Sequence, residues 1–112
     1  MPNFLYVFRG GMSSRTFSPK EMQESMQKWG AWIQQLTKTG NFKAGDPLEP
    51  GGKVVRGSRK VVTDGPYAET KDVVGGYLLV SASSLDEAVE LSRGCPIFDN
   101  DGSVEVRQIH QM

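Results

Sequence analysis

The residues best suited to proton chemistry in this sequence lie close together, between Asp64 and Lys71. An acid, a phenol, a second acid and an amine follow one another there, as Asp64, Tyr67, Glu69 and Lys71. Such a set can move protons between carbon or oxygen atoms of a small ligand when burial shifts one carboxylate toward its neutral form. Asp64 and Glu69 are therefore the catalytic candidates. The ligand-binding candidates in the same run are Gly65, Pro66, Tyr67 and Lys71.

A purely structural role is the alternative for this run. An aspartate before Gly-Pro is typical of a turn, so Asp64 can cap the turn at Gly65-Pro66. Tyr67 would then pack against a partner chain, and Glu69 would pair with Lys71 or with another charge. The catalytic hypothesis needs a cleft beside the turn, whereas the structural one does not.

A second candidate pair, Glu105 and Arg107, lies near the end of the chain. Residues two apart on a strand project from the same face of the sheet. The planar guanidinium group could there bind a ligand that carries a carboxylate. Alternatively, the two side chains neutralise each other or reach water at the rim of a barrel.

The remaining reactive residues predict no metal site and no cofactor. His110 is the only histidine and stands two residues from the end of the chain, where we expect it to be exposed to solvent. Cys95 is the only cysteine, and we expect a buried structural thiol. No spacing matches a zinc site, and Asp99-Asn100-Asp101-Gly102 lacks the later residues of a calcium-binding loop.

The first half of the chain predicts a strand and then a long helix. Asn3–Phe8 is β-branched and aromatic, with apolar residues on both faces. Ser18, Pro19 and Glu21 are typical of a helix start with a capping box, and Gly40 suits its end. One apolar stripe, which we expect in the core, is formed by Met22, Met26, Trp29, Ile33 and Leu36.

The second half predicts a loop, a hairpin, two strands and a short helix. Asn41–Gly52 reads as a surface loop, and Lys53–Thr63 as a hairpin with a type II′ turn at Gly57-Ser58. Asp64-Gly65-Pro66 should end that pairing. The later elements are a strand over Val73–Ala82 with a bulge at Gly75-Gly76, a helix capped by Ser84 and Glu87, a turn at Asp99–Gly102 and a strand over Ser103–Ile109.

This order of elements predicts one α+β domain over residues 1–112. It is a split β-α-β pattern with an extra hairpin, which implies a ferredoxin-like antiparallel sheet with both helices on one face. The other face of the sheet is left uncovered, although the strands carry apolar residues at both odd and even positions and so on both faces. A monomer rarely exposes such a patch, so we expect a homodimer.

Composition narrows the functional classes. The 112 residues include 13 basic and 13 acidic ones, so the excess positive charge that binds nucleic acid is missing. The start of the chain has no basic stretch followed by a long apolar one, so we expect neither secretion nor a membrane span. The cytoplasm is therefore the expected location.

Several motifs resemble those of the YCII-related family of the DGPF type. Residues 62–71 read VTDGPYAETK, which is similar to the DGPF signature. Further landmarks follow in order: Gly75-Gly76-Tyr77, Ser84-Leu85-Asp86-Glu87-Ala88 and Val104-Glu105-Val106-Arg107. The resemblance implies a dimeric α+β barrel. Some members carry a proposed histidine–aspartate pair with the histidine on the first helix, but that helix has no histidine here, so the pair is not carried over.

Two functions are compatible with these observations. The first is a homodimer that binds a small organic ligand near Asp64–Lys71 and Arg107 and transforms it by proton transfer without a cofactor. The alternative is a non-enzymatic regulatory or scaffold dimer. A deep, partly apolar pocket favours the first, whereas a sealed interface with every side chain paired favours the second.

Overall fold

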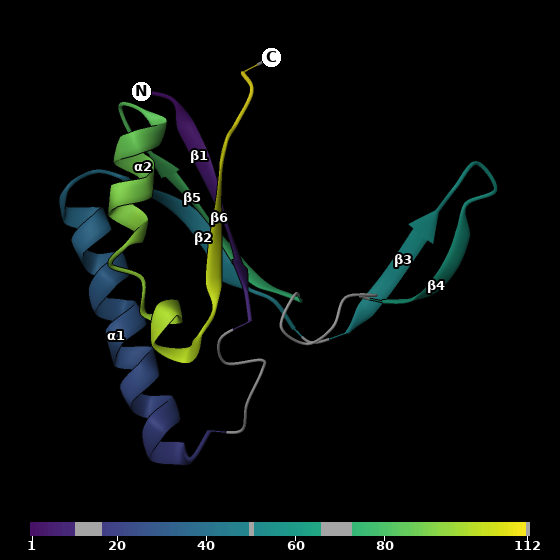
Figure 1. Ribbon diagram of the computed structural model, residues 1–112, viewed down its shortest axis with the longest axis horizontal. Helices are drawn as coiled ribbons and strands as arrows, with labels where there is room; N and C mark the ends of the chain where they lie inside the picture. Colours follow the sequence, from purple (N-terminus) through teal and green to yellow (C-terminus); the bar gives the residue numbers. More distant parts are fainter. Residues whose placement is uncertain (11–16, 50, 66–72, 112) are drawn as a thin grey trace.

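The computed structural model describes residues 1–10, 17–49, 51–65 and 73–111. Its elements are β1 (Asn3–Arg9), α1 (Pro19–Lys38), β2 (Phe42–Pro47), β3 (Gly52–Arg56), β4 (Val61–Gly65), β5 (Val74–Ser81), α2 (Leu85–Ser92), the 3₁₀ helix η3 (Pro96–Asn100) and β6 (Ser103–Gln108). Figure 1 shows α1 and α2 on one side of the main sheet and the β3–β4 hairpin standing away from it.

The main sheet is antiparallel, with the strand order β2-β5-β1-β6. Together with the two helices it forms the ferredoxin-like β-α-β-β-α-β arrangement, which confirms the predicted α+β fold with both helices on one face. The β3–β4 hairpin is an insertion between the second and third strands of that arrangement.

The predicted loop over Asn41–Gly52 was wrong, because β2 lies within it and pairs with β5. Gly45 and Pro47 within this strand are typical of a loop, so the strand was not predicted. Gly45 is required there, since a Cβ atom at that position would lie 2.7 Å from the carbonyl oxygen of Tyr77. Pro47 ends the strand at the edge of the sheet, where proline is tolerated.

The hairpin also differs from its prediction. Arg56 pairs with Val61, so the loop holds four residues rather than a two-residue type II′ turn. The amide of Lys60 donates to the carbonyl of Gly57 over 3.0 Å, and Lys60 is left-handed with φ of 56°. Pairing continues to Asp64 and Gly65, because both still carry an amide hydrogen, which Pro66 lacks.

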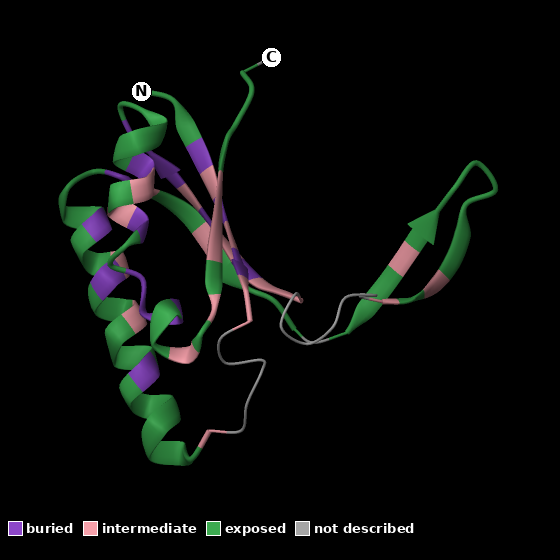
Figure 2. Cartoon of the chain, viewed as in Figure 1, coloured by how far each residue is buried: buried purple, intermediate pink, exposed green. Residues whose placement is uncertain are grey.

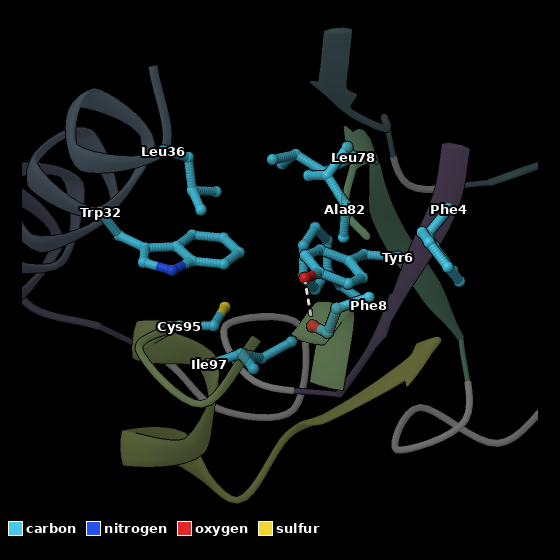
Figure 3. Packing of buried hydrophobic residues seen from close by; sticks show 11 residues of the cluster. Phe4, Tyr6, Phe8, Trp32, Leu36, Leu78, Ala82, Cys95 and Ile97 are labelled. Carbon is cyan, nitrogen blue, oxygen red and sulfur yellow. Dashed lines mark hydrogen bonds between the residues drawn. The ribbon is translucent and has the colours of Figure 1, made fainter. Parts of the chain in front are cut away.

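The core lies between the helices and the inner face of the sheet (Figure 3). Phe4, Tyr6 and Phe8 alternate inward along β1, as predicted, and Tyr6 stacks on Trp32 of α1 with ring centroids 6.1 Å apart. The full set of buried apolar residues is Phe4, Tyr6, Phe8, Trp32, Leu36, Leu78, Val80, Ala82, Ala88, Cys95 and Ile97.

Only part of the apolar stripe on α1 belongs to this core. Trp32 and Leu36 are buried, and Trp29 and Ile33 pack against the core. Met22 and Met26 are 40% and 66% exposed, so the prediction that they are core residues was wrong. Figure 2 shows the buried positions of α1 as separate short stretches of an otherwise mostly exposed helix. The start of α1 therefore extends past the part of the sheet against which the rest of the helix packs.

Local signals at the helix ends were read more accurately. The capping box of Ser18 and Glu21 is complete, and Gly40 is left-handed with φ of 78°. At α2 the hydroxyl of Ser84 accepts from the amide of Glu87, but the Glu87 carboxylate accepts from Ser83 instead of Ser84. The second predicted capping box is thus only half formed. The predicted turn at Asp99–Gly102 begins inside η3 and closes at Asp101, which is left-handed.

The bulge predicted at Gly75-Gly76 is confirmed. Phe8 pairs with Gly76 and the next residue, Arg9, pairs with Val74, so Gly75 is the extra residue on β5. Gly76 is needed for close packing, since a Cβ atom there would lie 3.1 Å from the carbonyl oxygen of Asp46. The bulge bends β5 at the end of the sheet that faces the start of α1.

Candidate functional site

An apolar cleft of about 870 Å³ lies between the first half of α1 and the sheet. Met22, Met26 and Ile33 line it from the helix, and Phe42 and Leu78 line it from β2 and β5. It exists because the exposed start of α1 is not covered by sheet residues. A cleft of this size is within the usual range for small-molecule sites.

Aromatic rings form one wall of the cleft. Phe8 and Trp29 both line it and meet edge to face, with centroids 5.1 Å apart and planes at 87°. Trp32 packs against Trp29, with ring centroids 5.8 Å apart. The indole N–H of Trp29, which can only donate, has no hydrogen-bond partner among the described residues.

Two glycines leave the cleft open from opposite sides. Gly30 on α1 and Gly75 on β5 line it, and a Cβ atom at either position would meet no atom within 4 Å. Glycine inside a helix costs about 1 kcal/mol relative to alanine, so Gly30 is an expensive choice for the fold alone. The space that it leaves belongs to the cleft.

Glu49, which follows β2, lines the cleft. Asp46 also lies at the cleft, but its carboxylate accepts a hydrogen bond of 3.1 Å from the Tyr77 hydroxyl on the opposite face of the sheet, because Tyr77 pairs with Val7. This bond to a carboxylate raises the pKa of the Tyr77 phenol above its ordinary value. None of the described lining residues is a lysine or an arginine. The described residues of the cleft therefore include the carboxylate of Glu49 and the indole of Trp29, but no cation.

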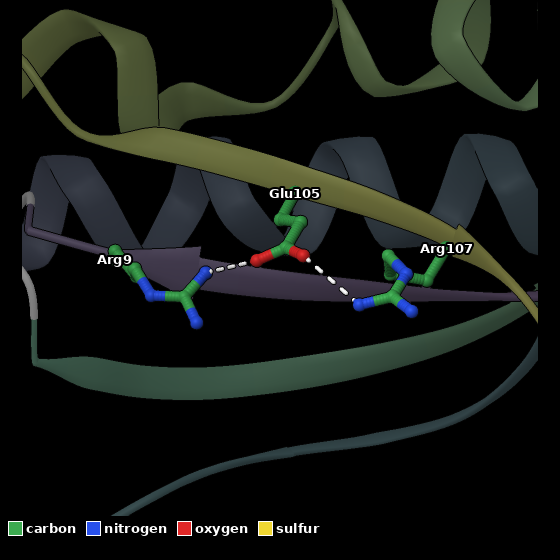
Figure 4. Close-up of polar contacts among 3 residues, drawn as sticks. All are labelled: Arg9, Glu105 and Arg107. Atoms are coloured by element: carbon green, nitrogen blue, oxygen red, sulfur yellow. Dashed lines mark hydrogen bonds and ion pairs between the residues drawn. The ribbon is translucent and has the colours of Figure 1, made fainter.

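The opposite face of the sheet carries the predicted pair Glu105 and Arg107. Both project from the face that bears Val7 and Leu5, since Val7 pairs with Glu105 and Leu5 with Arg107. Figure 4 shows Glu105 held between Arg9 and Arg107, and its bond to Arg107 is 3.4 Å long. The hydrogen bond from Arg9, then that from Arg107, lowers the pKa of the Glu105 carboxyl.

The predicted site residues that the structure describes lie in two separate places within one chain. Asp64 and Gly65 lie in β4 of the hairpin, where the Asp64 carboxylate is 88% exposed and pairs with Lys53. Glu105 and Arg107 lie on the sheet face opposite α1, so neither group joins the cleft. Pro66, Tyr67, Glu69 and Lys71 lie outside the described residues.

The residues that build the cleft were not among the sequence candidates, although two signals pointed to them. Gly30 interrupts the apolar stripe of a long helix, which is unfavourable unless space is needed. Asp46 follows Gly45 in a stretch that reads as a turn, yet it belongs to an edge strand beside the cleft. Neither signal could be placed without knowing that β2 lies opposite the start of α1.

Other reactive groups have structural surroundings. Cys95 is buried, as predicted, and burial raises the pKa of its thiol to about 12. His110 is exposed, also as predicted. Among the described residues, no three side chains of the His, Cys, Asp or Glu type come together in a way that could hold a metal ion. No helix in the described part of the chain is both long and apolar enough to span a membrane.

Comparison with known proteins gives matches in both sequence and structure. An uncharacterized protein of Rhizobium meliloti (strain 1021) is 42% identical over 50 residues, which is 44% of this chain and 40% of that protein. The chain thus matches less than half the length of that relative. The fold is similar to that of 5-chloro-2-hydroxyhydroquinone dehydrochlorinase from Burkholderia phenoliruptrix AC1100, solved in complex with 2,5-dihydroxybenzoquinone.

The structural match has a TM-score of 0.54 at 16% identity and covers 97% of this chain and 95% of the other. The two chains therefore share an arrangement of helices and strands along almost their whole length. The sequence matches the YCII-related domain over residues 6–112, which include both helices and nearly all of the sheet. The chain belongs to the YCII-related domain family.

Proposed function

We propose that this protein is a homodimeric small-molecule-binding protein whose ligand occupies the cleft between α1 and the sheet. The observation that carries the proposal is the cleft of about 870 Å³ with aromatic and aliphatic walls. Gly30 and Gly75 keep it open at a cost to the fold that packing does not require. A scaffold dimer would gain nothing from such a space.

The walls favour a ligand with a flat ring and polar substituents. Phe8 and Trp29 offer an edge and a face for stacking, which aromatic pairs prefer. The indole N–H of Trp29 suits a carbonyl or hydroxyl oxygen, and the carboxylate of Glu49 suits a hydroxyl hydrogen. Hydroxylated aromatic or quinoid rings have this combination, and the dehydrochlorinase of similar fold was solved with a ligand of that class.

The homodimer part of the proposal is supported by the sheet face opposite the helices. Leu5 and Val7 of β1 and Leu79 of β5 lie there, only half-buried, around the charged group of Arg9, Glu105 and Arg107. Packing two such faces together would remove the apolar side chains from water. It would also give Arg107, whose side chain is 71% exposed, a more enclosed setting.

Cofactor-free proton transfer is the chemistry that we propose for the bound ligand. Within one protomer, Glu49 lines the cleft and is the nearest described acid or base group, since the Asp46 carboxylate is bonded to Tyr77 on the other face of the sheet. Asp64 and Glu69 remain proposed catalytic groups on the strength of the sequence. Asp64 is exposed in the hairpin, so it could act only on a ligand held by another part of the assembly.

A thermal-shift assay with 2,5-dihydroxybenzoquinone and a panel of hydroxylated benzenes tests ligand binding. A ligand at about a hundred times its dissociation constant stabilises the fold by about 2.7 kcal/mol. Gly30→Leu should abolish the shift because its side chain fills the cleft, whereas Gly30→Ala should retain it. The proposal fails if no ring compound shifts the wild type, or if Gly30→Leu responds equally.

Light scattering tests the dimer independently. The wild type should have twice the 12.3 kDa mass of the chain at micromolar concentration. Leu79→Glu on the open sheet face should give a monomer. Leu85→Glu, at an exposed leucine on α2, is the matched control and should remain a dimer. A dimer that binds none of the ring compounds would favour the scaffold function instead.

A further inference from the structure

The β3–β4 hairpin stands apart from the other helices and strands that the structure describes. Its two strands form a separate sheet, and Figure 1 shows it projecting away from the main sheet and the helices. An isolated two-stranded hairpin is at best marginally stable in water, so an element of this kind usually needs support from another surface. The colours of Figure 2 show that most of the hairpin is exposed.

One face of the hairpin is apolar where no described residue covers it. Val55 and Val62 are directly paired across the two strands and are 62% and 59% exposed. The next pair on the same face is Lys53 with Asp64. A surface that covered the valine pair would therefore also come close to Asp64.

The hairpin is also strongly basic relative to the rest of the chain. Between Gly52 and Gly65 lie four basic residues and one acidic residue, whereas the whole chain is neutral, so the remainder carries three net negative charges. Lys53 pairs with Asp64. Arg59 and Lys60 at the tip form no ion pair with the described residues.

The mouth of the cleft is apolar and acidic, which complements the apolar and basic hairpin. Met22, Met26 and Leu48 are exposed apolar residues that line it, and Glu49 lines it together with them. Glu49 has no ion-pair or hydrogen-bond partner among the described residues. No described residue that lines the cleft is a cation, whereas the hairpin tip carries two, Arg59 and Lys60.

We infer that the hairpin of each copy lies across the mouth of the cleft of a second copy, with Val55 and Val62 on Leu48 and the methionines, and with Arg59 and Lys60 beside the carboxylate of Glu49. The same chain is a poor occupant, because the hairpin starts just after Glu49 and extends away from the sheet. The inference rests on the proposed dimer and cleft.

The consequence for function is that the site is complete only in the dimer. The partner's hairpin contributes the cations that the cleft lacks, which suits the oxygen anion of an ionised hydroxyl group on a ring. It also brings Asp64 of the partner subunit toward the ligand, because Asp64 shares a face with the valine pair. Asp64 of the partner subunit and the cleft would then form one site built from two chains.

Disulfide trapping between two differently tagged chains tests this arrangement. One chain carries Leu48→Cys and the other Val55→Cys, and the mixture is oxidised after subunits have exchanged. Cys95 can remain, because its thiol is buried. We expect the mixed disulfide to form about a hundredfold faster than with a partner that carries Glu90→Cys on α2, since docking raises the effective concentration of the thiols.

A second pair of variants tests the valine face. Val62→Asp should lower the rate of trapping strongly, whereas Val61→Asp on the other face of the hairpin is the matched control and should change it little. Trapping no faster than with Glu90→Cys would overturn the inference. Trapping only within one chain that carries both cysteines would overturn it as well, because the hairpin would then cover its own cleft.

The outcomes for the hairpin and for the proposed function are separable. If the wild type is a dimer and binds ring compounds but trapping fails, the hairpin inference alone is wrong. If Gly30→Leu and Leu79→Glu behave like the wild type, the proposed function fails whatever the hairpin does.

Discussion

The hydroxyl of Tyr6 donates a hydrogen bond to the carbonyl oxygen of Ala88, which ties the central strand β1 to the helix α2 (Figure 3). Both residues are fully buried. The bond crosses the core between elements that are far apart in the sequence, so it positions α2 against the sheet. Burial and, to a lesser degree, the nearby Cys95 raise the pKa of Tyr6 to about 12.

Tyr6→Phe should destabilise the fold by about 1 kcal/mol, because it removes this bond and leaves the packing of the ring unchanged. Urea unfolding at neutral pH measures the difference. Tyr77→Phe is the matched control, since the Tyr77 hydroxyl bonds to Asp46 at an exposed position and should matter less for stability. Equal effects of the two substitutions would contradict the importance of the buried bond.

Stability should fall as the pH rises from about 9 to about 12. Burial raises the pKa of Cys95 from 9.0 to about 12, so the unfolded chain releases this proton before the folded one does. A raised folded pKa means that the stabilisation is complete below the unfolded pKa and is lost as the pH approaches the folded one. The slope is at most about 1.4 kcal/mol per pH unit for each such proton.

Chemical denaturation of the wild type and of Cys95→Ala over this alkaline range tests the prediction. The variant starts from a lower stability because it leaves a small cavity, but its stability should decline less steeply. Parallel curves for the two proteins would show that Cys95 ionises alike in the folded and unfolded chain.

Alanine should have opposite effects at two glycines near the cleft. Gly30→Ala should raise the free energy of unfolding by up to about 1 kcal/mol, because the helix gains and the new methyl group meets nothing. Gly45→Ala should lower it by about 1–3 kcal/mol, because the Cβ atom would collide with the backbone of β5. Thermal unfolding of both variants measures the difference in sign.

Asp64→Ala should change the free energy of unfolding by less than about 0.5 kcal/mol. The structure places this residue in a strand and pairs it with Lys53 at the surface, where ion pairs contribute little. A turn-capping role would instead predict a loss of about 1 kcal/mol, as for other capping side chains. Urea unfolding separates the two, and a turnover assay on a ring compound that binds would reveal any catalytic role.

Most of the fold could be predicted because its signals are local. Ser18, Pro19 and Glu21 satisfy amides within the first turn of α1, and alternation along Asn3–Phe8 depends only on the geometry of a strand. The strand β2 could not be predicted in the same way. Its stability comes from pairing with β5, which is distant in sequence, while its own glycine and proline indicate a loop.

The catalytic candidates show the same limit. Asp64 and Arg107 were expected to lie near the same ligand, but the register of β1 with β6 puts Arg107 on the open face while Asp64 lies in the hairpin. The methionines at the start of α1 have the spacing of core residues, and only the tertiary structure shows that they are exposed. Spacing determines the face of a helix but not what lies opposite it.

The sequence alone determined the family, the α+β class, the first helix with its caps and the two-sided apolar character of the strands, since each depends on neighbours within a few positions. The tertiary structure alone decided that β2 completes the sheet, that Gly30 and Gly75 face an open cleft and that the hairpin stands apart with its valines uncovered. These features arise from contacts between segments far apart in the chain, and no local pattern of residues encodes such distances.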